Sequence, residues 1–264
     1  MDKQTHKDII QVWHEGVQTF DNGNVDAALQ AFLGIGDPSA KILFNIGHLE
    51  MSQYRFGEGE VNFTAAVEKD PHMALAHFQL GMVYFHLHRY NESRNSYEKA
   101  KVCLRGNRFI DYRQLGFVHK LYECEVLYNL ALTYATMMNN SEYALELLDE
   151  AKKVSVEARH GPLIEKAQKR LLTNQLYEPV VLPSNQLFRP PKSKVVGLKN
   201  VDYLGKPKVV SELPESSNNN NETNFQPSPN SFRPIYDDFS DDDELSPTFN
   251  GGAPPPPPTG PQRE

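Results

Sequence analysis

Residues 80–100 read LGMVYFHLHRYNESRNSYEKA. Apolar residues recur here at helical spacing, and Gly81 and Ala100 are small residues among larger ones. The same pattern occurs once before at a constant offset, because Gly47 lies 34 residues before Gly81 and Ala66 lies 34 residues before Ala100. A constant offset of this length indicates a repeated structural unit. The stretch therefore predicts a pair of helices that occurs more than once in the chain.

Two less regular copies flank these two. The first surrounds Gly16, 31 residues before Gly47, and the last surrounds Ala131, 50 residues after Gly81. Thirty-four residues is the period of the tetratricopeptide repeat, a helix–turn–helix unit with small residues where its helices cross. We predict an all-α fold, a tetratricopeptide superhelical solenoid of four repeats with a capping helix at about residues 162–174; an unspecific helical bundle is the alternative. The positions that match the repeat signature are Trp13, Gly16, Ala28, Phe32, Gly47, Phe63, Ala66, Pro71, Leu80, Gly81, Tyr84, Tyr90, Tyr97, Ala100, Leu130, Ala131, Tyr134, Ala144, Leu148 and Ala151.

The composition changes after residue 175. Five prolines stand between residues 179 and 207 among short β-branched runs, and proline cannot continue a long helix. Beyond residue 210 an asparagine run, an acidic cluster and five consecutive prolines predict a disordered tail. The expected organisation is a repeat domain at residues 1–175 with an insertion at about 101–121, an extended segment packed on its groove at 176–200, a short segment at 201–211, and a disordered acidic and proline-rich tail at 212–264.

Charge and composition exclude several classes of function. The formal net charge of the 264-residue chain is −7, whereas a nucleic-acid-binding protein carries a basic face, so we expect no nucleic-acid partner. No run approaches the roughly 18 apolar residues of a membrane span, and the N-terminus lacks the apolar stretch of a signal peptide. The two cysteines, Cys103 and Cys124, are too few for a disulfide framework. These features predict a cytoplasmic protein without direct membrane insertion.

Catalytic motifs are missing from the sequence. No Gly-rich phosphate loop, nucleophile elbow or HExxH occurs, so we expect no enzyme activity, no catalytic residue and no cofactor. His77, His86 and His88 have no cysteine or carboxylate beside them at ligand spacing, so we expect no metal site. Tetratricopeptide domains usually bind peptides in their groove or partners on their loops.

The insertion between the third and fourth repeats is the first candidate for such binding. It contains arginines together with Phe109, Ile110 and Asp111, and a mixture of arginine, aromatic and aliphatic residues is typical of a binding hot spot. A solenoid tolerates insertions in its loops, so we expect this segment to project from one edge. A structural loop whose Phe109 and Ile110 tuck into the stack is the alternative, and the residues do not decide between the two.

Four short motifs resemble a known family. They are LRGNRFIDY at 104–112, LYEPVVLP at 176–183, LFRP at 187–190 and DYLGK at 202–206. Together with the repeats they resemble, over about residues 10–210, the cytosolic activators of the phagocyte NADPH oxidase, the neutrophil cytosol factor 2 and NADPH oxidase activator family. By this resemblance the chain is a shortened form or a fragment, because full-length members continue into SH3 and PB1 domains.

The resemblance implies a non-catalytic activator. Such a protein binds Rac, a small GTPase, in its GTP form and stimulates electron transfer in a membrane flavocytochrome that produces superoxide, and it is recruited from the cytoplasm to membranes on activation. In place of the family's serine stands Ala40, and Phe109 replaces an aliphatic residue, which affects affinity and the choice of GTPase. By position, the Rac contacts are Ala40, Asp70, His72, Arg105, Gly106, Asn107, Phe109 and Asp111.

The resemblance also assigns roles to the segments after the repeats. The extended chain folds back into the groove through Val180, Val181, Leu182, Leu187 and Phe188. The segment at 201–211 becomes the oxidase activation segment, with Tyr203, Leu204 and Val209 as contact residues; a plain linker is the alternative, and Pro207 departs from the family's usual residue.

Two further binding functions follow from the residues. Pro258, Pro261 and Arg263 fit P-x-x-P-x-R, a pattern of SH3 ligands, so an SH3 protein is a possible partner of the tail. A tetratricopeptide adaptor of the co-chaperone type, which holds acidic C-termini in its groove, is the alternative function. Such adaptors need an asparagine after the first-repeat glycine, and here Val17 follows Gly16.

Overall fold

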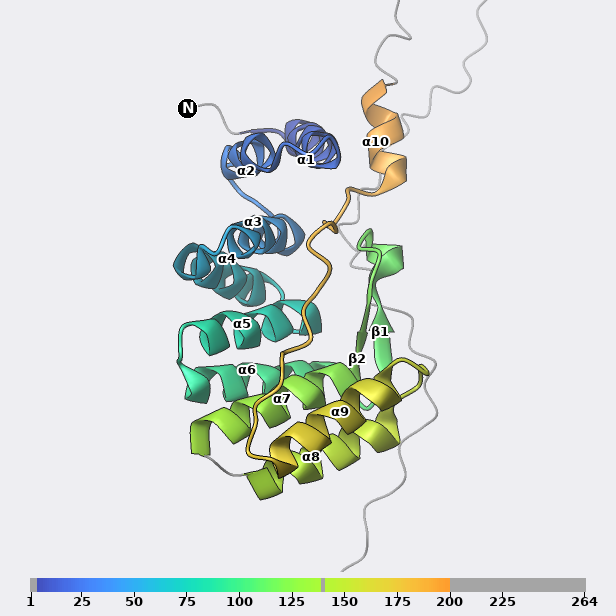
Figure 1. Ribbon diagram of the computed structural model, residues 1–264. Helices are drawn as coiled ribbons and strands as arrows, with labels where there is room; N and C mark the ends of the chain where they lie inside the picture. Colours follow the sequence, from blue (N-terminus) through green and yellow to red (C-terminus); the bar gives the residue numbers. More distant parts are fainter. Residues whose placement is uncertain (1–3, 139–140, 200–264) are drawn as a thin grey trace, which may run out of the picture. The chain divides into compact units, whose positions relative to one another are not determined.

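The computed structural model describes residues 4–138 and 141–199. The predicted activation segment with Tyr203, Leu204 and Val209, the tail, and the SH3-ligand residues Pro258, Pro261 and Arg263 lie outside the described residues. Within the described part the elements, drawn in Figure 1, are α1 (His6–Asp21), α2 (Val25–Leu33), α3 (Ala40–Ser52), α4 (Phe56–Lys69), α5 (Ala74–His86), α6 (Tyr90–Cys103), β1 (Phe109–Asp111), the 3₁₀ turn η1 (Tyr112–Leu115), β2 (Lys120–Tyr122), α7 (Glu123–Met138), α8 (Ser141–Val154), α9 (His160–Leu172) and α10 (Lys192–Lys199).

The helices stack in chain order. Each helix from α1 to α8 packs against the next, and α9 covers α8. The pairs α1–α2, α3–α4, α5–α6 and α7–α8 correspond to the four predicted repeats. The predicted all-α tetratricopeptide solenoid is therefore confirmed, and the helix that closes the stack begins at His160, two residues before its expected start.

The spacing of the repeat has a steric cause. A methyl group added at Gly16 would lie 2.5 Å from the Phe32 ring, and one added at Gly81 would lie 2.7 Å from the Tyr97 ring. These distances are shorter than a carbon–carbon contact allows, so the helices of the first and third pairs can approach this closely only because the first helix has no side chain at that point. Gly47 faces the Phe63 ring in the same way at 3.2 Å.

Local signals fix where the first helices begin. The Thr5 side chain accepts a hydrogen bond from the Asp8 amide, and the Asp8 carboxylate accepts one from the Thr5 amide, which together form a capping box at the start of α1. The Asn24 side chain caps α2 by accepting from the Ala27 amide. These caps satisfy amides that have no partner within the helix.

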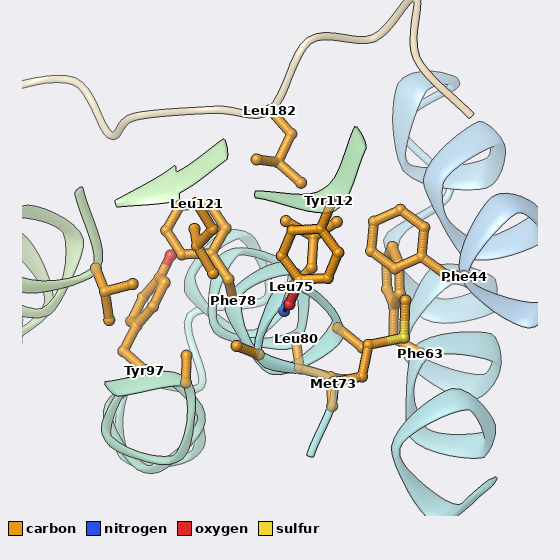
Figure 2. Close-up of a cluster of buried hydrophobic side chains, with 14 of the residues drawn as sticks. Phe44, Phe63, Met73, Leu75, Phe78, Leu80, Tyr97, Tyr112, Leu121 and Leu182 are labelled. Carbon is orange, nitrogen blue, oxygen red and sulfur yellow. Dashed lines mark hydrogen bonds between the residues drawn. The ribbon is translucent and has the colours of Figure 1, made fainter. Parts of the chain in front are cut away.

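The core is continuous from the repeats into the insertion and the segment after α9. Figure 2 shows Phe44, Phe78 and Tyr97 of the repeats in one cluster of buried side chains. Leu121 of β2 and Leu182 of the extended segment project into the same cluster. The insertion and the extended segment therefore contribute to the core of the stack and are not external additions to it.

The chain after α9 is extended only in part. From the end of α9 it runs back past α7, α5 and α3 toward α1 (Figure 1), without helix or strand up to Pro191. The expectation of extended chain through residue 200 is wrong for residues 192–199, which form α10. The physical reason is that Pro190 and Pro191 are tolerated at the beginning of a helix, and no proline follows them within α10. No helix in the described ranges is long and apolar enough to cross a membrane.

Replacing Gly81 by alanine tests the steric basis of the repeat. Overpacking a rigid core costs about 1–3 kcal/mol, so we expect Gly81→Ala to lower the free energy of unfolding by about that amount. Gly57→Ala is the matched control, because Gly57 is an exposed helical residue and no other group of the described chain lies within 4 Å of an added methyl. Helix propensity predicts that this control raises stability by about 0.5–1 kcal/mol. Urea unfolding measures both, and equal effects would contradict the explanation.

Candidate functional site

The insertion forms a short β-hairpin. Its strands β1 and β2 pair antiparallel, with Ile110 opposite Leu121, and η1 lies between them. The Tyr112 amide donates to the His119 carbonyl oxygen at 3.0 Å, which extends the ladder toward the turn. At the base, the Glu123 amide donates to the Arg108 carbonyl oxygen at 2.9 Å. The hairpin therefore presents two of the predicted contact residues, Phe109 and Asp111, on hydrogen-bonded backbone.

The two side chains at the centre of the insertion, Phe109 and Ile110, differ in how far they are buried. Ile110 is buried among residues of the core, as the structural-loop interpretation expects. Phe109 is 38% exposed, which contradicts that interpretation and fits a projecting binding residue. Its ring lies 5.6 Å from the Tyr122 ring, and the Lys120 ammonium lies 4.8 Å from its centre. Phe109 is thus held in a defined orientation on the surface.

Asp111 is oriented by its own neighbours. Its carboxylate accepts from the Arg113 amide at 3.0 Å and from the Arg113 guanidinium at 2.9 Å. These bonds to Arg113 hold the pKa of Asp111 below its usual range, so the side chain is a carboxylate at neutral pH. A partner that donates to Asp111 therefore meets an acceptor that is already fixed in place.

The turn that leads from α6 into β1 has left-handed backbone. Arg105 has φ +52° and Gly106 has φ +77°. A left-handed conformation is costly for a residue with a side chain, and glycine adopts it without strain. Asn107 closes the turn, because both its amide and its side-chain nitrogen donate to the Leu104 carbonyl oxygen, at 2.9 Å and 2.8 Å. The turn leaves the Arg105 side chain exposed.

The α4–α5 turn lies beside the start of the insertion. Asp70, which ends α4, accepts from the His72 amide at 3.1 Å, and both side chains are exposed. The buried thiol of Cys103 donates to the Pro71 carbonyl oxygen at 3.6 Å. Burial raises the pKa of the Cys103 thiol, and Asp70 and Arg105 both lie near enough to influence it electrostatically. The structure thus brings Asp70, His72 and Arg105 to one neighbourhood.

The first predicted contact position lies next to the same turn. Ala40 is the first residue of α3 and is partly buried against the core. Its neighbour Lys41 is close enough to Asp70 for their charges to interact. The Lys69 ammonium and the Asp37 carboxylate form an ion pair at 2.5 Å across the same two connections. The α2–α3 turn, the α4–α5 turn and the insertion therefore follow one another along one edge of the stack.

A cluster of polar side chains fastens the base of the hairpin to α9 and to the residues just before it. The Tyr122 hydroxyl donates to the Glu157 carboxylate, and the Tyr122 ring packs edge-on against His160, with 4.7 Å between ring centres. The Glu125 carboxylate lies 3.0 Å from the Arg159 guanidinium and 3.3 Å from His160 Nε2. Burial raises the pKa of Glu125 to about 7, so this group titrates near neutral pH.

The same cluster contains an arrangement of cysteine, histidine and carboxylate. Cys124 Sγ lies 3.2 Å from His160 Nδ1, whose other nitrogen faces Glu125. Burial raises the pKa of the Cys124 thiol to about 12. A nucleophilic cysteine needs a lowered pKa and access to its substrate, and Cys124 has neither, since it is 2% exposed. The cluster is a packing feature of the hairpin base.

The groove of the repeats holds the chain's own extended segment. The Asn45 side chain, on α3, donates to the Phe188 carbonyl oxygen at 2.8 Å and accepts from the Phe188 amide at 2.7 Å. The Trp13 indole, on α1, donates to the same carbonyl oxygen at 2.9 Å. Asn129, on α7, holds Val180 by the same pair of bonds, each 2.8 Å long. Two asparagine side chains thus hydrogen-bond to the backbone of the segment, as such side chains would bond to a bound peptide.

Between these two clamps the segment packs by apolar contacts and one histidine. His48 lies 3.2 Å from the Pro183 carbonyl oxygen through Nε2 and 3.0 Å from the Gln79 side-chain nitrogen through Nδ1. Of the residues expected in the groove, those that are buried or partly buried are Val180, Leu182, Leu187 and Phe188. The expectation is wrong for Val181, which is 58% exposed because neighbouring residues of an extended chain point to opposite sides.

Asn45 and Asn129 were not among the predicted site residues, although the sequence contains a signal for them. Asn45 stands two residues before Gly47, and Asn129 stands two residues before Ala131. The equivalent residue of the third repeat is Gln79, which is also buried. A buried amide that recurs at one position of a repeat indicates a line of hydrogen-bonding groups along the groove, since such groups need partners. Within residues 4–138 and 141–199, no cluster of three or more His, Cys, Asp or Glu side chains could hold a metal ion.

Comparison with known proteins identifies the relatives of this chain. A family model described as tetratricopeptide repeat matches residues 74–103. Neutrophil cytosol factor 2 of Homo sapiens is 40% identical over 204 residues, which cover 77% of this chain and 38% of that protein. NADPH oxidase activator 1 of Rattus norvegicus is 34% identical over 221 residues, covering 80% of this chain and 47% of that protein. An NADPH oxidase activator of Dictyostelium discoideum is 29% identical over 186 residues, covering 70% of this chain and 30% of that protein.

These relatives confirm the resemblance drawn from the sequence motifs. The chain is homologous over most of its length to proteins named neutrophil cytosol factor 2 and NADPH oxidase activator. It spans less than half the length of each of these relatives.

The buried histidine of the groove predicts a pH dependence of stability. Burial lowers the pKa of His48 to about 4, whereas a histidine in the unfolded chain has a pKa near 6.5. As the pH falls, His48 therefore takes up a proton in the unfolded chain before it does so in the folded chain. The free energy of unfolding decreases from about pH 6.5 downward. We expect His48 to account for a loss of about 2 kcal/mol between pH 7.5 and pH 5.0.

Urea unfolding of the wild type and of His48→Gln at both pH values measures this loss. The difference between the two proteins at pH 7.5 reports the contacts that the substitution removes. The additional change at pH 5.0 reports the titration of His48, since the variant has no group to protonate there. A variant that loses as much stability as the wild type between the two pH values would show that His48 is not responsible.

Proposed function

From homology to NADPH oxidase activators, we propose that this chain is a non-catalytic activator subunit of a superoxide-generating NADPH oxidase. In this proposal a Rac-type small GTPase in its GTP form binds along the edge formed by the insertion and the neighbouring turns. The chain stimulates electron transfer in a membrane flavocytochrome, to which it is recruited from the cytoplasm.

One observation supports this binding mode above all others. The hairpin and the turns beside it present exposed Arg105, Asp70 and His72 on one edge, together with oriented Phe109 and Asp111. Arg105 supplies donors for carbonyl or carboxylate groups of a partner loop, and Asp111 supplies an acceptor for a cation or an amide. Phe109 adds an apolar anchor on the same strand as Asp111. Donors, an acceptor and an apolar side chain thus lie at one edge, where a globular partner has access.

Dependence on GTP follows from the partner's chemistry. Switch loops of small GTPases are ordered by contacts with the γ-phosphate and its magnesium ion and are released on hydrolysis. A surface of fixed side chains binds an ordered loop with a smaller entropic cost than a mobile one. The GTP form is therefore the form that this edge favours. A contact of loop size has modest affinity, which a shared membrane would strengthen by raising the effective concentration.

Because the groove is occupied by the chain's own segment, a partner bound at the edge is favoured over a partner bound in the groove. A co-chaperone-type adaptor needs a free groove for the C-terminus of its client. Here Asn45 and Asn129 are both bonded to the chain's own backbone, at Phe188 and Val180. A client peptide would have to displace these bonds and the buried Leu182 and Leu187. We therefore place the adaptor function second.

Contact with the flavocytochrome is proposed for the segment that follows the described residues. The motif DYLGK at 202–206 leads to Val209, and we propose Tyr203, Leu204 and Val209 as its apolar contacts. The P-x-x-P-x-R pattern of Pro258, Pro261 and Arg263 is proposed to bind an SH3 domain.

Charge reversal at Arg105 tests the GTPase contact. Loss of a hot-spot arginine costs about 2 kcal/mol or more, so we expect Arg105→Glu to weaken binding of GTP-loaded Rac by about 30-fold or more in isothermal titration calorimetry. Lys166→Glu, the same charge reversal at an exposed position of α9, is the control and should bind as the wild type does. If the two variants bind equally well, the GTPase does not use this surface.

Truncation of Val209 tests the activation segment separately. Loss of one buried apolar contact corresponds to about a tenfold change in an equilibrium, so we expect Val209→Ala to lower superoxide production about tenfold in a cell-free oxidase assay. Binding of GTP-loaded Rac should remain unchanged. Val181→Ala, which removes the same groups at an exposed position of the groove segment, should retain full production. Full production by Val209→Ala would exclude Val209 as a contact.

A further inference from the structure

The turn after η1 touches the backbone of the groove segment. Gly116 has φ +87°, and its carbonyl oxygen accepts from the Arg189 amide at 3.0 Å. A methyl group added at Gly116 would lie 2.5 Å from the Arg189 carbonyl oxygen and 3.1 Å from its nitrogen. Glycine is therefore required at this position for two reasons, the left-handed backbone and the close approach of a second chain segment.

The side chains around this contact connect three parts of the fold. The Phe117 and Phe188 rings lie 4.9 Å apart between centres, and both residues are fully buried. Phe188 is held by Asn45 of α3 and by Trp13 of α1. The Arg189 guanidinium lies 2.7 Å and 2.8 Å from the two carboxylate oxygens of Asp21, at the end of α1. Residues 188–189 thus join the insertion to the first two repeats.

We propose that Gly116 is a positioning residue that latches the groove segment to the insertion, so that the two open and close as one cooperative unit. A partner bound at the insertion then fixes the point at which the chain beyond Arg189 leaves the repeats. This effect of a bound partner rests on the proposed function, because the partner is taken to be a GTP-loaded Rac-type GTPase. The cooperativity between the groove segment and the insertion is a property of this chain alone.

The coupling has a definite physical form. The turn that bonds Arg189 has left-handed backbone at Gly116, and the Phe117–Phe188 contact forms only when both segments are in place. Buried, close-packed elements of this kind have discrete arrangements and do not deform continuously. Binding that favours the closed arrangement of the insertion also favours the closed segment. By linkage, a partner that binds the closed arrangement lowers the population of the open segment, and a variant binds that partner more weakly only in proportion to the closed fraction it loses.

The latch, the contact between Gly116 and Arg189, is tested first by changing the insertion. Hydrogen exchange of the full chain is measured by mass spectrometry with peptides that resolve residues 180–199. Gly116→Ala removes the close approach, and loss of a buried hydrogen bond opens a segment about tenfold more often. We expect the Phe188 amide to exchange about tenfold faster in this variant. Gly23→Ala is the matched control, since Gly23 has φ +84° but no other described group within 4 Å of an added methyl. Equal exchange at Phe188 in the two variants would overturn the latch.

The reverse experiment disturbs the segment and observes the insertion. Asn45→Ala removes the clamp on Phe188 without changing any residue of the insertion. We expect the amides of Tyr112, Phe117 and His119, which are bonded within the insertion, to exchange about tenfold faster. Asn129→Ala removes the equivalent clamp at Val180, further from the latch, and should change these amides less. Unchanged insertion amides in Asn45→Ala would overturn cooperativity even if Gly116→Ala does not fold.

A final measurement adds GTP-loaded Rac to the wild type and to Gly116→Ala. We expect the GTPase to slow exchange at Phe188 and Arg189 in both proteins, because binding to the closed arrangement lowers the population of the open one. If the GTPase binds the wild type and leaves these amides unchanged, the inference fails and the proposed function stands. If the GTPase does not bind the wild type, the proposed function fails, and the exchange of the two variant pairs alone decides whether the latch exists.

Discussion

The close approach of two helices over a residue without a side chain is the constraint on which this structure depends. At Gly16, Gly47 and Gly81 the aromatic ring of the second helix fills the space that a side chain would take. Each pair therefore has one crossing point, and the next pair can stack on it in the same way. In the fourth pair Ala131 takes the place of glycine, and it is completely buried. Stacking on this pattern sets the order of the turns along the edge of the solenoid.

The groove side of the stack is completed by the chain itself. Asn45, Gln79 and Asn129 are buried amides on the inner helices, and buried polar groups need hydrogen-bond partners. The extended segment supplies partners for two of these residues through the backbone of Val180 and Phe188. Its apolar side chains close the core over β2 and η1, as Leu182 shows in Figure 2. A surface that binds peptides in other solenoids is thereby part of the interior here.

The hairpin at the edge is anchored by buried residues and hydrogen bonds beneath it. The hairpin rests on Ile110, Phe117 and Leu121, all buried. At its base, Tyr122 contacts His160 of α9 and bonds to Glu157 in the turn before α9. Its turn is bonded to the groove segment at Arg189. Exposed side chains such as Phe109 therefore stand on a backbone that the core holds in place.

The sequence alone determined the parts of this protein that depend on local spacing. The 34-residue offset between Gly47 and Gly81 predicts the helical pairs, and the longer interval before Ala131 predicts the position of the insertion, because helix periodicity and steric crossing act over short distances along the chain. The tertiary structure alone decided that Ile110 is buried and Phe109 exposed, and that Asn45 and Gly116 hold residues 188 and 189. These outcomes depend on contacts between residues more than 70 positions apart or on which side of a short strand meets the core, and no local pattern contains that information.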